Sequence, residues 1–144
     1  MNYLEMPIYN YTPHNIVVVV GDDVLSIAPT GLARVEQKFF PHPKGAVILG
    51  DSVIPLVTST YGSVVGLEDY DWDQASILVV SIVVAHAIRA ARASQASSAY
   101  QCRGRGTTYI ATPARLVRHE EGPMKGQVKG CEALEIIIAI EGDE

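Results

Sequence analysis

Residues 75–100 constrain the fold most, because they join a short apolar run to the strongest helix-forming segment of the chain. The run 77–80 is short and rich in β-branched residues, which predicts a strand buried on both faces. After Ser81 alanine dominates, and alanine has the highest intrinsic helix propensity. The Ser81 hydroxyl can cap the first turn by accepting a backbone N–H. We therefore expect one buried strand that leads directly into the only substantial helix.

The rest of the chain consists of short apolar runs separated by turn residues, as expected for turn-linked strands. Gly21 and Asp22 predict a hairpin between the first two runs, and Pro29-Thr30-Gly31 predicts a type II turn. Residues 39–45 contain two prolines and a glycine, and predict a loop, while Pro55 indicates an edge strand or a bulge. The expected strands cover residues 16–20, 24–27, 32–36, 46–49, 52–58, 77–80, 107–111, 115–118 and 134–140, with a further turn and short strand at residues 60–67.

These patterns predict an α+β fold, a mostly antiparallel sheet of short strands with one main helix packed on one face. A length of 144 residues predicts a single domain over residues 1–144, with residues 1–11 as an N-terminal arm or edge strand. Positive mean hydropathy favours a homo-oligomer, a dimer or larger. No apolar stretch is long enough for a bilayer, and no signal peptide opens the chain, so we expect a cytoplasmic protein without membrane contact.

The charges are unevenly distributed along the sequence. Residues 74–119 contain no acidic residue and six of the arginines, although the whole chain has a net charge of −5. Such a window predicts a local positive surface that attracts anions. A nucleic acid polymer usually requires a basic domain overall, so a small anionic ligand is the better match. Equally open is an ion-pair network in which these arginines face the acidic segment 68–73 of the same or a neighbouring subunit.

Sequence motifs for catalysis, cofactors or metals are absent. There is no dinucleotide-binding fingerprint, nucleophile elbow or phosphate-binding loop, and we expect no cofactor. Cys102 and Cys131 have no closely spaced partner, which predicts free thiols. The carboxylates of residues 68–73 do not have EF-hand spacing, which favours a solvated loop over a metal site. His86, with Arg89 one turn later, can donate hydrogen bonds to an anion, so binding without catalysis is the expectation.

Five short motifs occur in order along most of the chain. They are Thr12-Pro13-His14, the turn 29–35 with Arg34, residues 60–67 with Thr60 and Tyr61, Val80-Ser81 with Val84-Ala85, and Leu116-Val117-Arg118 before Gly130-Cys131. Together these motifs resemble a small protein family that is common in phage and prophage genomes. The chain departs from the family pattern in its longer N-terminal arm and in residues 37–46 and 101–107, where family members are more compact.

The family looks similar to the first-described type of Thoeris anti-defence proteins, which sequester cyclic ADP-ribose isomers made by TIR enzymes. The resemblance implies a phage protein of the host cytoplasm that binds a cyclic nucleotide, or in some members a cyclic oligonucleotide, without cleaving it. It also implies a dimer or larger homo-oligomer with pockets at subunit contacts. Arginine suits bidentate phosphate contacts and tyrosine can stack on a base. The implied ligand-binding residues are Arg34, Thr60, Tyr61, His86, Arg89, Arg115 and Arg118.

Two other functions remain open from the sequence. The apolar strands, the tyrosine-rich N-terminal arm and the acidic loop are also typical of a phage structural or interaction protein that forms a homo-oligomer without a small-molecule ligand. An enzyme acting on a nucleotide is the third hypothesis, and it rests only on His86 and scattered carboxylates.

Overall fold

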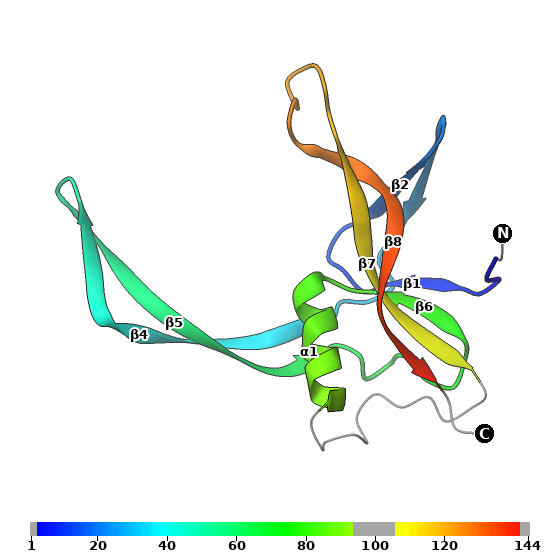
Figure 1. Ribbon diagram of the computed structural model, residues 1–144, viewed down its shortest axis with the longest axis horizontal. Coiled ribbons are helices and arrows are strands. Elements are labelled where there is room, and N and C mark those ends of the chain that lie inside the picture. The colour runs from blue at the N-terminus through cyan, green and yellow to red at the C-terminus, as the bar shows by residue number, and fades with distance from the viewer. Residues whose placement is uncertain (1–2, 94–105, 142–144) are drawn as a thin grey trace.

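A curled six-stranded sheet carries one helix on its face and a long two-stranded arm at its side (Figure 1). The computed structural model describes residues 3–93 and 106–141. Within these residues the elements are β1 (Ile8–Asn10), β2 (Ile16–Val20), β3 (Asp23–Ile27), β4 (Arg34–Leu49), β5 (Ser52–Val65), β6 (Ser76–Val79), α1 (Ile82–Ala93), β7 (Thr107–Arg118) and β8 (Val128–Glu141).

The strand order of the sheet is β1-β6-β7-β8-β2-β3. The central hairpin β7–β8 and the hairpin β2–β3 are antiparallel, whereas β1–β6, β6–β7 and the single bridged pair of β2 with β8 are parallel. Most paired residues of the protein are therefore antiparallel, and the prediction of an α+β fold with one main helix is confirmed. Within residues 1–11, Ile8–Asn10 forms the edge strand β1 beside β6.

The strand β6 is buried on both faces, as its apolar sequence predicts. Leu78 packs on the helix side of the sheet with Ile110, Ile140 and Ile88 of α1. Val79 packs on the opposite side with Ile16. Alternate residues of a strand point to opposite faces, so one short strand anchors both layers of the core.

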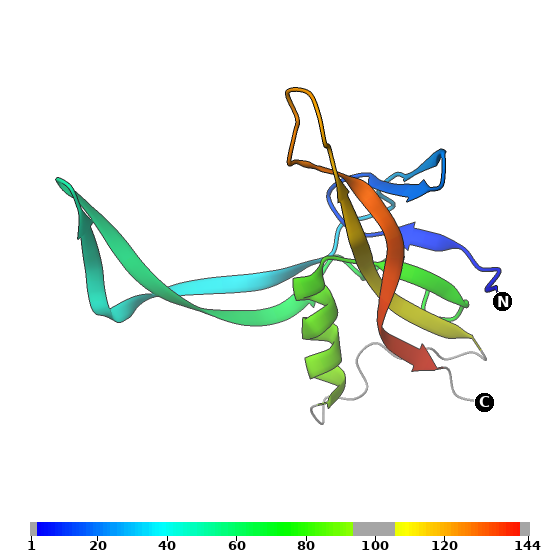
Figure 2. The same ribbon diagram turned by 45° about the horizontal axis from the view of Figure 1, so that its top comes forward.

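The helix α1 begins directly after Ser81 and lies against the sheet (Figure 2). The Ser81 Oγ accepts a hydrogen bond of 3.3 Å from the backbone N–H of Val84, which is the predicted cap. Val84, Ala85 and Ile88 are buried, and the side chains of His86 and Arg89 lie on the more exposed side of the helix. The amphipathic pattern thus buries one stripe of α1 and presents its polar stripe to solvent.

The strands β4 and β5 form an antiparallel arm that projects away from the sheet, and this corrects the sequence-based prediction of residues 32–67. The expected loop at residues 39–45 is part of β4, and residues 60–65 continue β5 instead of forming a separate turn and strand. Prolines are tolerated because each strand of a two-stranded ribbon is an edge strand. A register shift lies between Pro41 and Ala46, which pair with Val57 and Pro55, and it accommodates the prolines, so the predicted edge or bulge at Pro55 is confirmed.

Two further local predictions are wrong. The segment 107–118 is one continuous strand and not the two strands expected at 107–111 and 115–118, and within it Arg115 has a φ of 53°. The segment Pro29-Thr30-Gly31 is no type II turn with a left-handed glycine. Instead, a Cβ on Gly31 would lie 2.7 Å from the Tyr11 ring, so glycine is required there by close packing.

The acidic segment 68–73 is exposed mainly at its charged side chains. Tyr70 is buried and its ring meets those of Tyr9, Tyr11 and Trp72 edge-on, with centroids 5.9, 5.9 and 4.7 Å away. The Tyr11 hydroxyl donates to Asp69 Oδ1 at 3.3 Å. Burial, followed by the neighbouring Asp69 carboxylate, raises the pKa of Tyr11 above 10.0. The aromatic residues of this segment therefore belong to the core.

Candidate functional site

Two adjoining hollows lie where the base of the arm meets α1, and we call them together the arm–helix junction. One hollow of about 410 Å³ is lined by Arg34, Gln37 and Tyr61 together with residues preceding and beginning α1. The other, of about 300 Å³, is lined by Tyr61, Val83, His86 and Ala87. Tyr61 and Val83 line both hollows, so they lie between the hollow that contains Arg34 and the hollow that contains His86.

The pairing register of the arm brings these side chains together. Gln37 lies opposite Tyr61, and Arg34 lies opposite Val65 at the end of the ribbon. A register shift separates these pairs, and such bulges re-aim side chains and increase local twist. Since Arg34 and Tyr61 are distant in sequence, their proximity follows from the ribbon register.

His86 and Arg89 form a hydrogen-bonded pair on the exposed stripe of α1. Arg89 Nη2 lies 2.7 Å from His86 Nδ1. A guanidinium has only donors, so Arg89 donates and His86 Nδ1 accepts, which places the imidazole proton on Nε2. The pair therefore presents the remaining Arg89 N–H groups and His86 Nε2–H as donors for an anion.

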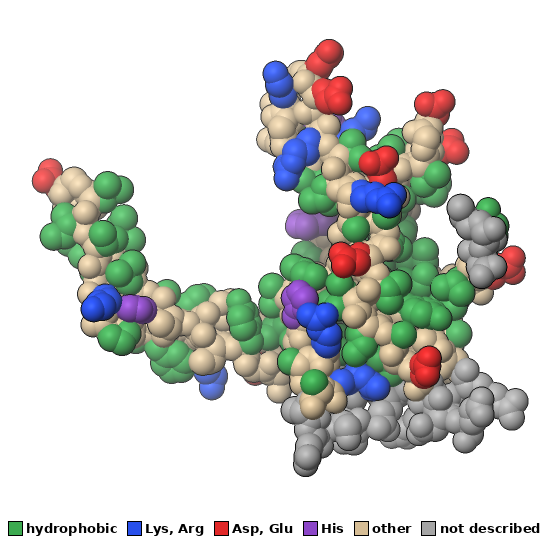
Figure 3. Space-filling view, in the orientation of Figure 1, with side chains coloured by type: hydrophobic (Ala, Val, Ile, Leu, Met, Phe, Trp, Pro, Cys, Tyr) green, Lys and Arg blue, Asp and Glu red, His purple; other side chains and the backbone are tan. Residues whose placement is uncertain are grey.

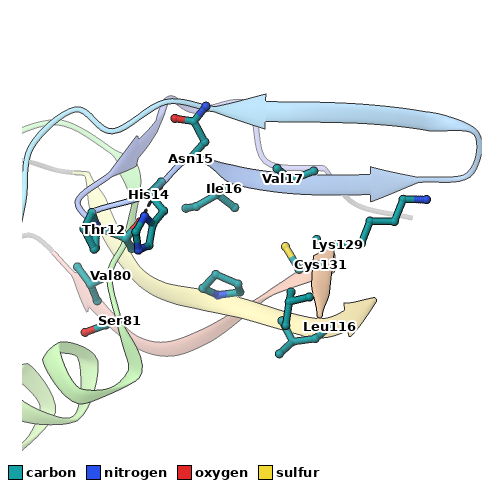
Figure 4. Close-up of a pocket in the computed structure, with 14 residues that line it drawn as sticks. Thr12, His14, Asn15, Ile16, Val17, Val80, Ser81, Leu116, Lys129 and Cys131 are labelled. Carbon is teal, nitrogen blue, oxygen red and sulfur yellow. Dashed lines mark hydrogen bonds between the residues drawn. The ribbon is translucent and has the colours of Figure 1, made fainter. Parts of the chain in front are cut away.

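A larger hollow, which we call the groove, lies between β2 and the β7–β8 hairpin (Figure 4). Its volume is about 510 Å³. Buried Ile16, Val80 and Cys131 contribute to its apolar lining, and Lys129 lies at one end, away from Thr12, His14 and Ser81 (Figure 4). Cys131 is a free thiol, as predicted, while Cys102 lies outside the described residues.

The buried side chain of Asn10 shapes the Thr12–His14 side of the groove. Its Nδ2 donates to the backbone carbonyls of His14 at 2.8 Å and Ile27 at 2.9 Å. Its Oδ1 accepts from the Thr12 backbone N–H at 2.9 Å and the Thr12 hydroxyl at 2.6 Å. Asn10 thus fixes the turn before β2 by satisfying its polar groups.

The groove and the arm–helix junction adjoin each other. Pro13 and Ser81 line both the groove and the hollow that contains Arg34. Tyr61 and Val83 then connect that hollow to the one containing His86. The hollows thus form a row from the β7–β8 hairpin to the polar stripe of α1.

The structure brings together only part of the predicted ligand-binding set. Arg34, Tyr61, His86 and Arg89 gather at the junction. Thr60 precedes Tyr61 in β5 and lies opposite Lys38, and successive strand residues point to opposite faces. Among the described hollows, Thr60 lines none.

Arg115 and Arg118 lie apart from the junction, toward the β7–β8 hairpin at the far end of β7 from α1 (Figures 1 and 2). Arg118 Nη1 donates to the Gly126 carbonyl at 2.9 Å, and its side chain lines a hollow of about 410 Å³ that also contains Glu120 and Glu121. In the space-filling view, basic side chains lie near the helix and, separately, beside acidic ones at the hairpin (Figure 3).

The acid-free sequence window therefore does not form a single positive surface within the described residues. Two of its arginines are on α1 and two are near the β7–β8 hairpin, while Arg103 and Arg105 lie outside the described residues. The expectation failed because absence of acidic residues along a sequence does not determine which strands are neighbours. Glu120 and Glu121, just beyond the window, fold back beside Arg118.

Sequence reasoning did not identify Gln37, His14 and Lys129 as lining residues. Gln37 is placed by the ribbon register, which no local pattern reveals. His14 and Lys129 line the groove, where Thr12-Pro13-His14, Val80-Ser81, Leu116 and Gly130-Cys131 meet. The family resemblance points to most of these motifs separately, and only the fold shows that they converge.

Over residues 3–93 and 106–141, no cluster of histidine, cysteine, aspartate and glutamate has a geometry suited to a metal ion. The same residues contain no helix long and apolar enough to cross a membrane. Comparisons with protein-family models, curated protein sequences and solved structures find no match. The function of this chain therefore has to be inferred from its own residues.

Proposed function

We propose that the protein binds a cyclic nucleotide at the arm–helix junction and sequesters it without cleavage. The observation that carries the proposal is the position of Tyr61, whose side chain is 58% exposed and lines two hollows, one with Arg34 and one with His86. An exposed aromatic ring offers a stacking surface for a base. Cationic and N–H donors in the two hollows that Tyr61 lines suit the phosphates of the same ligand.

Each residue has a distinct role in this proposal. Arg34 contacts one phosphate group of the ligand, and the Arg89–His86 pair donates hydrogen bonds to a second phosphate group. Because Arg89 occupies His86 Nδ1, His86 acts as a donor through Nε2 and has no free acceptor nitrogen for removing a proton. This arrangement favours holding the ligand over hydrolysing it.

The resemblance to Thoeris anti-defence proteins narrows the ligand class to cyclic ADP-ribose isomers or cyclic oligonucleotides. Such a phage protein would act in the host cytoplasm, where the signal is produced, and would need neither a cofactor nor contact with a membrane or nucleic acid polymer. The two hollows of the junction, about 410 and 300 Å³, with their donors and one aromatic ring, are on the scale of one small ligand.

The direct test is titration calorimetry with cyclic ADP-ribose isomers and with cyclic di- and trinucleotides. Mass spectrometry of the small molecules released by heating then identifies the ligand. We expect saturable binding of one class and recovery of that ligand intact after prolonged incubation. Absence of binding to every member of the panel would refute the proposal, and a linearised product would indicate an enzyme.

Substitutions at the junction locate the binding site. Arg34→Ala, Arg89→Ala and His86→Ala each remove a hydrogen bond to an anionic group, which is worth about 1.5–3 kcal/mol for charged pairs. We therefore expect dissociation constants to rise roughly tenfold to hundredfold. Lys125→Ala is the matched control, because it removes a positive charge from the exposed β7–β8 loop. Equal effects of the control and the junction variants would exclude a site at the junction.

A second candidate function is that of a structural or interaction protein without a small-molecule ligand. The specific observation in its favour is the arm, whose apolar side chains are exposed along most of its length (Figure 3). Purification as a stable assembly that binds no nucleotide from the panel would support this function over sequestration.

A further inference from the structure

The outer part of the arm, residues 38–60, has almost no cover within its own chain. Every residue in this range is exposed except His42, which is half-buried. Nine large apolar side chains are among them, and Ile48 reaches 73% exposure. The exposed apolar residues of residues 38–60 are Phe39, Phe40, Val47, Ile48, Leu49, Val53, Ile54, Leu56 and Val57.

Both faces of this ribbon are apolar. Val47 lies opposite Ile54, and the next pair, Ile48 and Val53, points to the other face. An isolated two-stranded ribbon is at best marginally stable in water, and contiguous exposed apolar surface of this extent marks an interaction site. The ribbon therefore requires cover from another molecule on both of its faces.

The charge content of the arm favours a permanent partner over a transient one. Only Lys38, Lys44 and Asp51 are charged within residues 38–60. Exposed strands of proteins that dissociate freely usually carry charged side chains that prevent unwanted pairing. Extensive apolar interfaces with few charges are typical of obligate homo-oligomers.

The same chain offers a complementary surface, the groove and the neighbouring β2–β3 hairpin. Leu116 and Val128 in the groove are exposed, as are Val24 and Leu25 of β3. The hairpin carries Asp22 and Asp23 and no basic residue, whereas residues 38–50 of the arm carry two lysines and no acidic residue. Both surfaces are apolar. The two lysines of the arm are opposite in charge to the two hairpin aspartates, and Asp51 at the arm tip is opposite in charge to Lys129 in the groove.

The arm of the same molecule does not occupy this surface. In both views the arm extends away from the sheet on the side opposite to β2–β3 (Figures 1 and 2). A strand of 16 residues spans at most roughly 50 Å, long enough to reach across a second molecule of this size. A reciprocal exchange of arms would cover both copies with a single type of contact and close the assembly.

We infer that the arm is a self-association element, and that residues 38–60 of one copy lie along the groove and the β2–β3 hairpin of a second copy. The contact follows from exposure, charge and shape alone. It holds whether or not the arm–helix junction binds a nucleotide.

The first experiment measures molar mass by light scattering during size-exclusion chromatography. The wild-type chain of 15.5 kDa is expected to elute as a multiple of its mass. Replacing residues 38–60 by Asn-Gly joins Gln37 to Tyr61, which already lie opposite each other and so accept a two-residue turn. This armless variant is expected to be monomeric. A monomeric wild type, or an armless variant with unchanged stoichiometry, would overturn the inference.

A complementation experiment tests the groove. The double variant Leu116→Asp/Val128→Asp keeps its arm and is expected to be monomeric, because charges replace exposed apolar contacts. Mixed with the armless variant, whose groove is intact, it should form a 1:1 complex. Ile136→Asp alters an exposed apolar residue of the same hairpin outside the groove and should leave the wild-type assembly intact. Full assembly of the double variant would show that arms pack on each other and would overturn the groove contact.

A crosslinking experiment changes only one residue of the chain, so its result does not depend on whether the armless and aspartate variants fold. A photoreactive p-benzoylphenylalanine at position 48 is expected to attach to peptides of the groove or of β2–β3. Mixing isotope-labelled and unlabelled chains shows whether the linked peptides come from different copies. Crosslinks confined to arm peptides, or to peptides of the same copy, would contradict the inference.

Discussion

The sheet and the arm contain the same kinds of residue, yet their apolar side chains have opposite environments. Leu78 and Val79 in β6 have no exposed surface, whereas Val47, Ile48 and Leu49 in β4 are all exposed. In the sheet, α1 and the neighbouring strands provide the cover. In the arm the two strands pair only with each other, so the same apolar sequence signals a core in one region and an interface in the other.

The largest effect on stability should come from Gly66, which directly follows β5 where the arm joins the rest of the protein. Gly66 has a φ of +100°, and a Cβ there would overlap the backbone oxygen of Leu32. Gly66→Ala is expected to destabilise the fold by more than about 4 kcal/mol, since the contacting atom belongs to the backbone. Chemical denaturation at fixed protein concentration measures the loss.

Gly45→Ala supplies the matched control for that prediction. Gly45 also has a positive φ of +84°, but nothing lies within 4 Å of the position that an alanine methyl group would take. Its substitution should cost about 1–2 kcal/mol from backbone strain alone. Similar losses for both alanine variants would show that the close approach to Leu32 is unimportant.

A matched pair of truncations compares the two regions directly. Leu78→Ala creates a cavity in the core and should cost about 2–5 kcal/mol in unfolding free energy. Ile48→Ala removes an exposed side chain and should change the unfolding free energy of the dissociated monomer by less than about 0.5 kcal/mol. Denaturation and dilution experiments separate the two: Leu78→Ala lowers stability at all concentrations, and Ile48→Ala weakens association. The reverse pattern would contradict the assignment of core and interface.

The polar anchor of the sheet is expected to have an intermediate effect. Asn10 is fully buried and makes four hydrogen bonds to backbone and side-chain groups. Asn10→Ala removes these bonds, but the Thr12 hydroxyl can still donate to the His14 carbonyl at 3.0 Å. The main loss is therefore at the Thr12 N–H and the Ile27 carbonyl, and it should cost about 2–4 kcal/mol, since each unsatisfied buried group costs about 1–3 kcal/mol. Asn10→Asp should cost more, because a carboxylate would face the carbonyls of His14 and Ile27. Thermal denaturation of both variants measures the order, and equal stability of Asp and Ala would disprove the donor role.

The smallest expected effect concerns the aromatic cluster, and it depends on pH. The raised pKa of Tyr11 means that the folded state holds this proton more tightly than the unfolded chain. The stability that the protonated Tyr11 contributes to the folded state is therefore fully present below pH 10 and is lost as the pH rises above 10 through the folded-state pKa. Tyr11→Phe should cost at most about 1 kcal/mol at neutral pH and should make the alkaline loss of stability shallower. An unchanged alkaline slope would show that Tyr11 does not contribute to it.

Local patterns in the sequence were sufficient to predict the helix, its cap and the strand before it. β6, Ser81 and α1 are neighbours in sequence, and their propensities agree with their tertiary positions. The arm could not be predicted in the same way, because Pro41, Pro43 and Gly45 are local signals for a loop. Only an unsupported ribbon, in which each strand has a free edge, accommodates them within a strand.

Four residues that meet at the candidate site were predicted by type, but the lining residue Gln37 and the arrangement were not. Arg34, Tyr61, His86 and Arg89 were identified by residue type and by the family resemblance, while their gathering depends on the pairing of Gln37 with Tyr61 and on the packing of α1 at the base of the arm. Arg115 and Arg118 shared a sequence window with Arg89 and lie on a different element. The strand order decides which charged residues lie on one surface, and a sequence window does not reveal it.

The parallel pairing of β1 with β6 has a consequence for how the chain folds during synthesis. Ile8 leaves the ribosome first, yet its partner Ile77 follows only after the whole arm has been made. At roughly 5–20 residues per second, β1 waits several seconds for its neighbour. The hairpins β2–β3 and β4–β5 can close within microseconds in that interval. The apolar arm of the nascent chain is therefore exposed before its sheet has formed. Nascent chains on the same messenger RNA would be close enough to associate through their arms.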